Sequence, residues 1–199
     1  MLDPLEHALY QVANASLRDY PSPHVWVEEV FPWDYYYSIR AHLAQATRFE
    51  EMPEYPGRQF SNDLPTWAIA FFSQQRWQQA ICLKFGISPT LTGMIRWTRD
   101  VAGYQLAPHT DAQKKVFTAL FYMSEVEQPH GTSFYTPKDY KTASDGTAKY
   151  PREDFLLARM FPFKPNCMLG MLRTNDSWHG VEPITEPGVR DILFYTLNR

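Results

Sequence analysis

The spacing of apolar residues divides the chain into an N-terminal part with helical periodicity and a C-terminal part with short apolar runs. In the first part, apolar residues recur every three or four positions, which is typical of amphipathic helices. Asp3 and Pro4 suit the start of the first helix, and Gly86 suits the end of the last. The pattern predicts helices over residues 4–17, 33–44 and 66–85 and a strand over residues 24–30.

From residue 89 onward, the apolar runs are short and are separated by Pro, Gly, Asn and Asp, as in strands joined by tight turns. The runs predict strands over residues 91–99, 104–111, 116–123, 131–136, 155–161, 166–172, 177–183 and 189–197. Such strands favour a jelly roll or closed sandwich over a βαβ architecture. We therefore expect a mainly β fold, with supporting helices and a first strand over residues 1–88 and the β core over residues 89–199.

The composition favours one globular domain over residues 1–199. With 199 residues, of which 44% are apolar, the chain can form one substantial core but hardly two. The 19 Lys and Arg residues against 22 Asp and Glu residues leave a net charge of −3. Because nucleic acids and anionic membranes attract basic surfaces, we expect neither as a partner.

The sequence shows no sign of export or membrane insertion. Its longest apolar runs are well short of the roughly 20 residues that cross a bilayer. Acidic residues near the N-terminus stand where a secretory signal carries basic ones. The two cysteines, Cys82 and Cys167, form neither a CxxC pair nor a disulfide framework. We therefore expect a cytoplasmic protein, and the sequence leaves its oligomeric state open.

Two histidines and an aspartate suggest a metal site. His109 and Asp111 lie two positions apart, so on a strand both side chains project from the same face. An isolated pair of this kind is more often a surface turn, but His179, on another predicted strand, offers a third ligand. Two histidines and one carboxylate leave three adjacent coordination positions open, which suits ferrous iron better than zinc. The motifs GxSxG, GxxxxGK[ST], GxGxxG and HExxH are absent, so the common hydrolase and nucleotide-binding sites are not indicated.

Arg190 is the next candidate, because strand alternation places it on one face with Ile192 and Phe194. A guanidinium among apolar neighbours needs an anion, and its planar fork binds a carboxylate in two places. For Arg190 alone, an internal ion pair with Asp191 or Glu182 is the simpler interpretation. With the three metal ligands in the same chain, we favour a carboxylate ligand instead.

Together these segments resemble the Fe(II)/2-oxoglutarate-dependent dioxygenases of the prolyl-4-hydroxylase-like superfamily. The resemblance rests on GYQLAPHTD at Gly103–Asp111, GTSFY at Gly131–Tyr135, SWHGV at Ser177–Val181 and Arg190, and it extends over about residues 90–197. It implies a double-stranded β-helix fold and an iron ion held by His109, Asp111 and His179. It also implies that Arg190 binds the distal carboxylate of 2-oxoglutarate and that O₂ is the oxidant.

The sequence departs from the common pattern of this superfamily at Asp100, where a tyrosine is frequent. The second partner of 2-oxoglutarate is therefore open. Tyr104, Thr118 and Tyr122 each offer a hydroxyl on or beside a predicted strand. Each is equally well explained as an ordinary core or sheet residue.

The resemblance implies hydrogen abstraction from an unactivated C–H, with release of succinate and CO₂. Hydroxylation is the expected outcome, and desaturation or ring closure stays open. We expect a small polar, carboxylate-bearing substrate, bound by one or more of Arg96, Arg99 and Arg173, although Asp100 or Asp176 could pair with these arginines instead. The alternatives are a peptidyl hydroxylase of the prolyl type and a non-catalytic metal-binding β-barrel. The long polar segment 137–154 is a candidate lid over the substrate.

Overall fold

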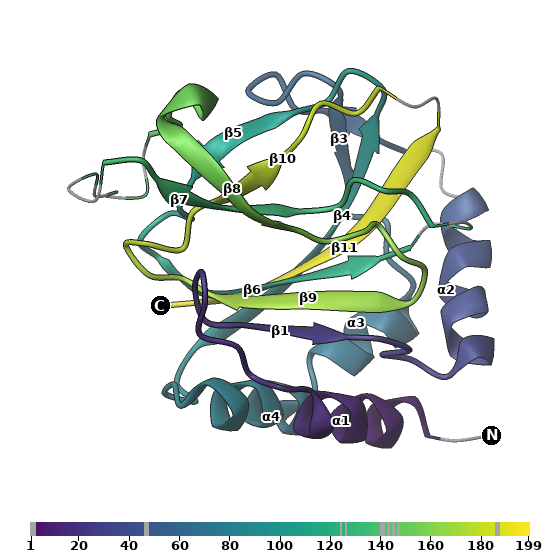
Figure 1. Ribbon diagram of the computed structural model, residues 1–199. Coiled ribbons are helices and arrows are strands. Elements are labelled where there is room, and N and C mark those ends of the chain that lie inside the picture. Colours follow the sequence, from purple (N-terminus) through teal and green to yellow (C-terminus); the bar gives the residue numbers. More distant parts are fainter. Residues whose placement is uncertain are drawn as a thin grey trace.

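Two antiparallel sheets packed face to face form the centre of this computed structural model (Figure 1). The structure describes residues 3–199 except 46–47, 124, 126, 140–141, 143, 145, 147 and 186–187. The strands are β1 His24–Val27, β2 Glu50–Glu51, β3 Arg58–Ser61, β4 Thr92–Val101, β5 Leu106–His109, β6 Lys115–Tyr122, β7 Ser133–Pro137, β8 Phe155–Met160, β9 Cys167–Leu172, β10 His179–Val181 and β11 Val189–Asn198. The larger sheet has the order β1-β9-β6-β11-β4-β3-β2 and the smaller one β5-β10-β7-β8. The predicted β fold of jelly-roll type with N-terminal helices is confirmed.

The helices are α1 Pro4–Asn14, α2 Trp33–Gln45, α3 Thr66–Phe72 and α4 Gln75–Phe85, with one 3-10 turn, η1, at Arg152–Asp154. Asp3 caps α1 by accepting hydrogen bonds from the backbone N–H groups of Leu5 and Glu6. In Figure 1, α1, α3 and α4 lie against the outer face of the larger sheet. None of the helices that the structure describes is long and apolar enough to cross a lipid bilayer. The predicted cytoplasmic location stays a prediction.

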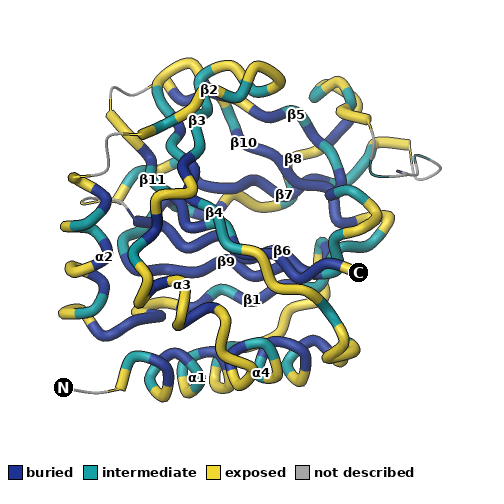
Figure 2. Tube along the Cα trace, turned by 180° about the vertical axis from the view of Figure 1, so that it is seen from behind, coloured by how far each residue is buried: buried dark blue, intermediate teal, exposed yellow. Residues whose placement is uncertain are grey.

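Strand alternation gives the larger sheet two different faces. On β11, Leu193, Tyr195 and Leu197 face outward and join the apolar core under the helices. The intervening residues Arg190 and Ile192 face inward, toward the smaller sheet. Figure 2 shows how the buried residues follow the strands of both sheets, while exposed residues cover the outer turns. The inner face of β11 therefore forms part of the space between the sheets.

The structure corrects the helix predicted over residues 66–85, which is two helices separated at Ser73 and Gln74. The first helix buries Ala68, Phe71 and Phe72, and a continuous helix would next bury positions 75, 76 and 79. Those positions carry Gln, Arg and Gln, which are exposed. The break shifts the helical phase so that Trp77, Ile81 and Phe85 reach the core instead.

The N-terminal part contributes more than the expected first strand. Besides β1 at one edge of the larger sheet, it supplies β2 and β3 at the other edge, and neither was predicted. β3 reads Arg-Gln-Phe-Ser, which has no apolar alternation, and both residues of β2 are exposed. Other elements are shorter than expected, since α1 ends at Asn14, β5 covers only residues 106–109 and β10 only 179–181.

A buried ion pair attaches β3 to β4. The Nε and Nη2 atoms of Arg58 donate to the two carboxylate oxygens of Asp100 over 2.6 and 2.8 Å. The side chain of Asp100 is 0% exposed and that of Arg58 is 12% exposed. Asp100, where the resemblance leads one to expect a tyrosine, is therefore the counter-ion of Arg58.

We predict that Arg58→Met lowers the free energy of unfolding by about 3–5 kcal/mol, because it leaves the Asp100 carboxylate buried without its partner. The double variant Arg58→Met with Asp100→Leu removes both charges and should recover much of this loss. Arg40→Met, which breaks an ion pair with the exposed Glu125, serves as the control and should cost about 0–1 kcal/mol. Urea denaturation measures all three. Equal losses in Arg58→Met and Arg40→Met would contradict the importance of the buried pair.

A second prediction concerns His24, which is fully buried on β1 between the rings of Phe134 and Phe161. Burial lowers the pKa of His24 below its ordinary value of 6.5. The unfolded chain therefore binds a proton at a pH where the folded chain does not, so stability is full above about pH 6.5 and falls as the pH drops through that value. We predict that His24→Leu has a flatter dependence of unfolding free energy on pH between 7.5 and 5, measured by urea denaturation. Parallel curves for the two proteins would show that His24 does not contribute.

Candidate active site

Antiparallel pairing of β5 with β10 brings His109 and His179 together. The two residues are direct partners in the register, and their ring centroids are 4.4 Å apart. The Nδ1 atom of His109 lies 3.1 Å from the carbonyl oxygen of Ala107, and that of His179 lies 2.9 Å from the carbonyl oxygen of Ser177. Since a carbonyl oxygen only accepts, each Nδ1 carries the hydrogen, which leaves Nε2 free to bind a metal.

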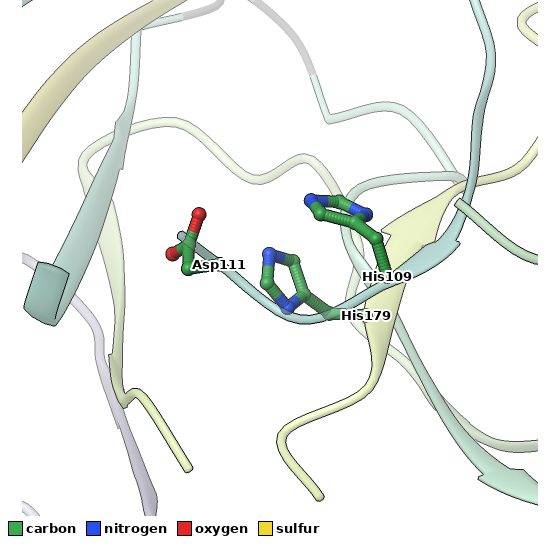
Figure 3. A group of neighbouring side chains, drawn as sticks. All are labelled: His109, Asp111 and His179. Atoms are coloured by element: carbon green, nitrogen blue, oxygen red, sulfur yellow. The ribbon is translucent and has the colours of Figure 1, made fainter. Parts of the chain in front are cut away.

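Asp111 completes the group, although not by sharing a strand face with His109. β5 ends at His109, so Asp111 lies in the following loop, where three side chains hold it. The Nζ atom of Lys115 donates to Oδ1 over 2.6 Å and the hydroxyl of Thr118 donates to Oδ2 over 2.6 Å. Arg173 Nε donates to the backbone oxygen of Asp111 over 3.2 Å. One ligand atom from each of the three candidate ligands lies within 4.8 Å of the others, and Figure 3 shows the two imidazoles and the carboxylate gathered together.

The protonation states of these residues suit a metal ion. Burial, together with the neighbouring His179, lowers the pKa of His109 to about 3. Burial also lowers the pKa of His179. For Asp111, burial alone would raise the pKa, but Lys115 and the two histidines bring it below its usual range. Two neutral imidazoles and one carboxylate are the forms that bind a metal ion, so the donor set fits ferrous iron in a facial arrangement.

Arg190 is a buried cation without a counter-ion in the part of the chain that the structure describes. Its side chain is among the largest that are fully buried, and none of its three guanidinium nitrogens has a hydrogen-bond partner there. Both acids considered as partners are engaged elsewhere, since Asp191 pairs with Arg99 and Glu182 with Arg152. The guanidinium lies 4.5 Å from the ring centroid of Phe163. Orphaned buried donors of this kind fit the carboxylate of an absent ligand.

The three candidate second partners of 2-oxoglutarate lie in different places. Thr118 donates its hydroxyl hydrogen to Asp111, so it orients the candidate metal ligand. Tyr122 donates to Thr132 over 2.9 Å, and burial raises the pKa of Tyr122 to about 12 although the Arg190 charge opposes this. Tyr104 is buried under the guanidinium of Arg58 and its hydroxyl has no partner among the described residues. Thr132, the hydrogen-bond partner of Tyr122, lines the cavity described next. Thr132 was not among the residues selected from the sequence.

A cavity of about 430 Å³ connects the metal-ligand group with Arg190. His109, Asp111 and His179 line it at one place and Arg190 at another, with Ile192 and Phe194 of β11 also in its wall. A small dicarboxylate and a further small molecule are of a size that such a space can hold. Among the described residues, the candidate metal ligands and the orphaned arginine thus line one common cavity.

The three arginines expected to bind substrate also lie in different environments. Arg96 on β4 lines the cavity. Arg99 points to the other face of β4, where it forms an ion pair with Asp191 over 2.7 Å and covers the ring of Phe49, so it is not brought to the cavity. Arg173 supports the backbone of Asp111 and donates to Asn175, and it does not line the cavity. Of these three arginines, only Arg96 lines the cavity.

Other residues of the site had little signal in the sequence. Lys115 looks like a solvated charge, yet it pairs with Asp111 four positions earlier. The candidate lid 137–154 lies partly outside the described residues, at 140–141, 143, 145 and 147. Its described members Gly146, Ala148 and Lys149 line the cavity, and the hydroxyl of Ser144 accepts a hydrogen bond from Thr110 over 2.7 Å. Whether the segment closes over a substrate stays a prediction.

Comparison with known proteins gives structural matches only. No family model and no curated protein matches the sequence. Among solved structures, HygX from Streptomyces hygroscopicus with nickel, 2-oxoglutarate and hygromycin B bound matches with a TM-score of 0.62 and 13% identity, over 96% of this chain and 86% of HygX. A prolyl-4-hydroxylase from Pseudomonas putida matches with a TM-score of 0.61 and 14% identity, over 98% of both chains. The α-ketoglutarate-dependent epimerase SnoN from nogalamycin biosynthesis matches with a TM-score of 0.59 and 14% identity, over 98% of this chain and 82% of SnoN.

The HygX structure contains nickel and 2-oxoglutarate, and SnoN is described as a non-haem α-ketoglutarate-dependent enzyme. The third protein is a prolyl-4-hydroxylase. At 13–14% identity the likeness establishes the fold. The chain has the fold of the Fe(II)/2-oxoglutarate-dependent oxygenases, as its sequence motifs predicted, and it carries within that fold a His-Asp-His group and a buried, unpaired arginine.

Proposed function

We propose that this chain is an Fe(II)/2-oxoglutarate-dependent oxygenase that acts on a small, carboxylate-bearing molecule. The single observation that carries the proposal is that the His109, Asp111 and His179 side chains and the orphaned guanidinium of Arg190 open into the same cavity. The two features are what a metal ion and a dicarboxylate cosubstrate require, and neither has another evident use in the fold.

The reaction uses one O₂ per turnover. One oxygen atom goes into succinate as 2-oxoglutarate loses CO₂, and the other goes into the substrate, whose C–H becomes C–OH. Bound Fe(II) supplies the site at which O₂ is activated and 2-oxoglutarate is oxidised. Hydroxylation is the outcome we propose. The carboxylate of Asp111 occupies the position that halogenating relatives keep free for chloride, so halogenation is disfavoured.

The residues of the chain divide the work between them. His109, Asp111 and His179 would hold the metal through one atom each, with Lys115 and Thr118 keeping the Asp111 carboxylate in place. Arg190 would bind the distal carboxylate of 2-oxoglutarate with two parallel N–H donors. Thr132 lines the cavity and accepts a hydrogen bond from Tyr122, so its own hydroxyl hydrogen would be available to 2-oxoglutarate.

A peptidyl hydroxylase of the prolyl type is the second candidate, since the P. putida prolyl-4-hydroxylase shares the fold over 98% of both chains. Support for a small molecule comes from the cavity of about 430 Å³ and from HygX, which holds hygromycin B in the same fold. The decisive experiment measures succinate formed by the Fe(II)-loaded protein with a panel of small acids and, separately, with prolyl peptides. Stimulation by prolyl peptides alone would reverse the choice.

A non-catalytic metal-binding barrel is the remaining alternative. Anaerobic addition of Fe(II) and then 2-oxoglutarate should give the weak visible charge-transfer band of a chelated 2-oxo acid. A protein that binds Fe(II) but shows no band and forms no succinate with any compound would support the non-catalytic alternative.

We predict that replacing His109, Asp111 or His179 by Ala abolishes Fe(II)-dependent succinate formation and weakens metal binding at least about 10-fold. Each change removes one ligand while the strands on either side stay paired. Metal content after dialysis and coupled succinate assays measure the effect, and circular dichroism checks the fold. Full activity in one of the three variants would exclude that residue as a ligand.

We predict that Arg190→Met raises the KM for 2-oxoglutarate about 30- to 150-fold, because a bidentate charge-assisted contact contributes about 2–3 kcal/mol. Arg190→Lys should recover only part of this, since an ammonium does not reproduce the planar fork. The KM for 2-oxoglutarate in succinate assays tests both variants. An unchanged KM in Arg190→Met would show that another residue holds the cosubstrate.

A further inference from the structure

The cavity wall carries far more positive than negative charge. The cationic side chains that line it are Arg58, Arg96, Lys114, Lys115, Lys149 and Arg190, whereas Asp111 is the one carboxylate among the described lining residues. Three of these six cations have an assignment. Arg58 is paired with Asp100, Lys115 with Asp111, and Arg190 is assigned to 2-oxoglutarate.

Arg96 differs from these because it makes no ion pair and no hydrogen bond within the described chain. Its guanidinium has one recorded contact, with the ring of Phe60, whose centroid is 5.1 Å from Cζ. The residue is half-buried on the inner face of β4, so its charge is partly removed from water. A guanidinium in such a position has all five N–H donors available for a ligand.

A series of neighbouring residues connects Arg96 with the metal-ligand group. Arg96 is the direct partner of Phe194 in the pairing of β4 with β11. On the other side of Phe194, the Nζ atom of Lys115 lies 4.8 Å from the ring centroid, and the same atom contacts Asp111. The ring of Phe194 thus lies between Arg96 and the Lys115–Asp111 pair, and Arg96 and Phe194 both line the cavity.

The sheet supplies an approximate scale for this arrangement. Thr118, which holds Asp111, lies on β6, and Arg96 lies two strands away on β4, with β11 between them. Thr118 pairs with Thr196 and Arg96 with Phe194, so the separation is two strand spacings across and two residues along, or about 12 Å. A molecule bound to Arg96 and reaching the metal site therefore has several bonds between its acidic group and its reacting carbon, and that connecting part lies over Phe194.

We infer that Arg96 and Phe194 form the binding site of the primary substrate, and that this substrate is a small acid with an apolar body and no free ammonium group. The inference rests on the proposed function for the position of the reacting carbon. It deepens that proposal by excluding zwitterions, because the one carboxylate among the described lining residues is held by Lys115 and Thr118 and assigned to the metal. Apart from that carboxylate, the charged side chains that line the cavity in the described part of the chain are all cationic, so an ammonium there is repelled.

The test uses three probes of one shape: 3-phenylpropanoate, 3-phenylpropanamide and 3-phenylpropylamine. Calorimetric titrations are made with Ni(II)-loaded protein at saturating 2-oxoglutarate, so that Arg190 is already occupied and no turnover takes place. We expect the acid to bind at least about 10-fold more tightly than the amide or the amine. Acetate, which has the charge but lacks the apolar body, should bind much more weakly than 3-phenylpropanoate.

Two variants of Arg96 and one matched control complete the experiment. Arg96→Met should weaken binding of the acid about 10-fold or more and leave the amide unchanged, and Arg96→Glu should reverse the preference toward the amine. The control Arg99→Met also removes an arginine side chain, but from the opposite face of β4, outside the cavity. It should leave the affinities for the acid, the amide and the amine unchanged. Thermal unfolding confirms that each variant is folded.

Three results would overturn the inference: equal affinity for the acid and the amide, equal effects of Arg96→Met and Arg99→Met, or no saturable binding of the acid up to about 10 mM. The same titration on metal-free protein needs neither metal nor 2-oxoglutarate. Arg96-dependent binding of the acid without any binding of 2-oxoglutarate would therefore contradict the proposed function alone. Oxidation of 2-oxoglutarate without selective binding of the acid would contradict this inference alone.

Discussion

The burial of Arg190, which has no counter-ion among the described residues, is the constraint on which the organisation of this site depends. A guanidinium cannot lose its proton at neutral pH, so burial leaves a full charge in a medium that solvates it poorly. Burial lowers the pKa of Arg190, which expresses the same unfavourable environment. The charge of Asp100 offsets only part of this cost, and Asp100, Glu182 and Asp191 are each bound to another arginine. Within the described residues, the buried guanidinium of Arg190 is therefore left available to an anion from outside the chain.

The metal-ligand group depends on a different kind of constraint, the register of two short strands. A shift of β10 by one residue against β5 would turn His179 away from His109, because neighbouring residues of a strand face opposite sides. Gly180 helps to fix this register, since a Cβ atom there would lie 2.4 Å from the carbonyl oxygen of Leu106 on β5. The close approach of the two strands thus excludes a side chain at position 180 and holds the two imidazoles in contact.

The sequence was informative where a short motif defines the chemistry and uninformative where long-range pairing does. His109, His179 and Arg190 could be selected as candidates from the sequence because their residue types and strand contexts suggest this chemistry. The strand-face argument for Asp111 was wrong in its reason, since β5 ends before it and Lys115 and Thr118 position its carboxylate. β3 and Arg58 were missed because a polar edge strand has no apolar alternation, and its place beside β4 is visible only in the folded chain. Likewise, whether Arg96 or Arg99 reaches the cavity depends on which face of β4 is turned inward.

Under the proposed function, the charges of the cavity side chains account for the binding of metal, cosubstrate and an acidic substrate in one place. In the chain alone, Lys115 neutralises Asp111 and Arg190 has no partner. With Fe(II) and 2-oxoglutarate bound, the two charges of the metal and that of Arg190 are balanced by Asp111 and the two carboxylates of the cosubstrate. The Asp111 carboxylate is then shared between Lys115 and the metal. Arg96, on the far side of Phe194, still has no ion-pair partner among the described residues. Because like charges in a partly dry space repel, this filled state favours an anion as the next ligand. An acidic substrate would therefore bind more tightly after the cosubstrate than a neutral one of the same shape.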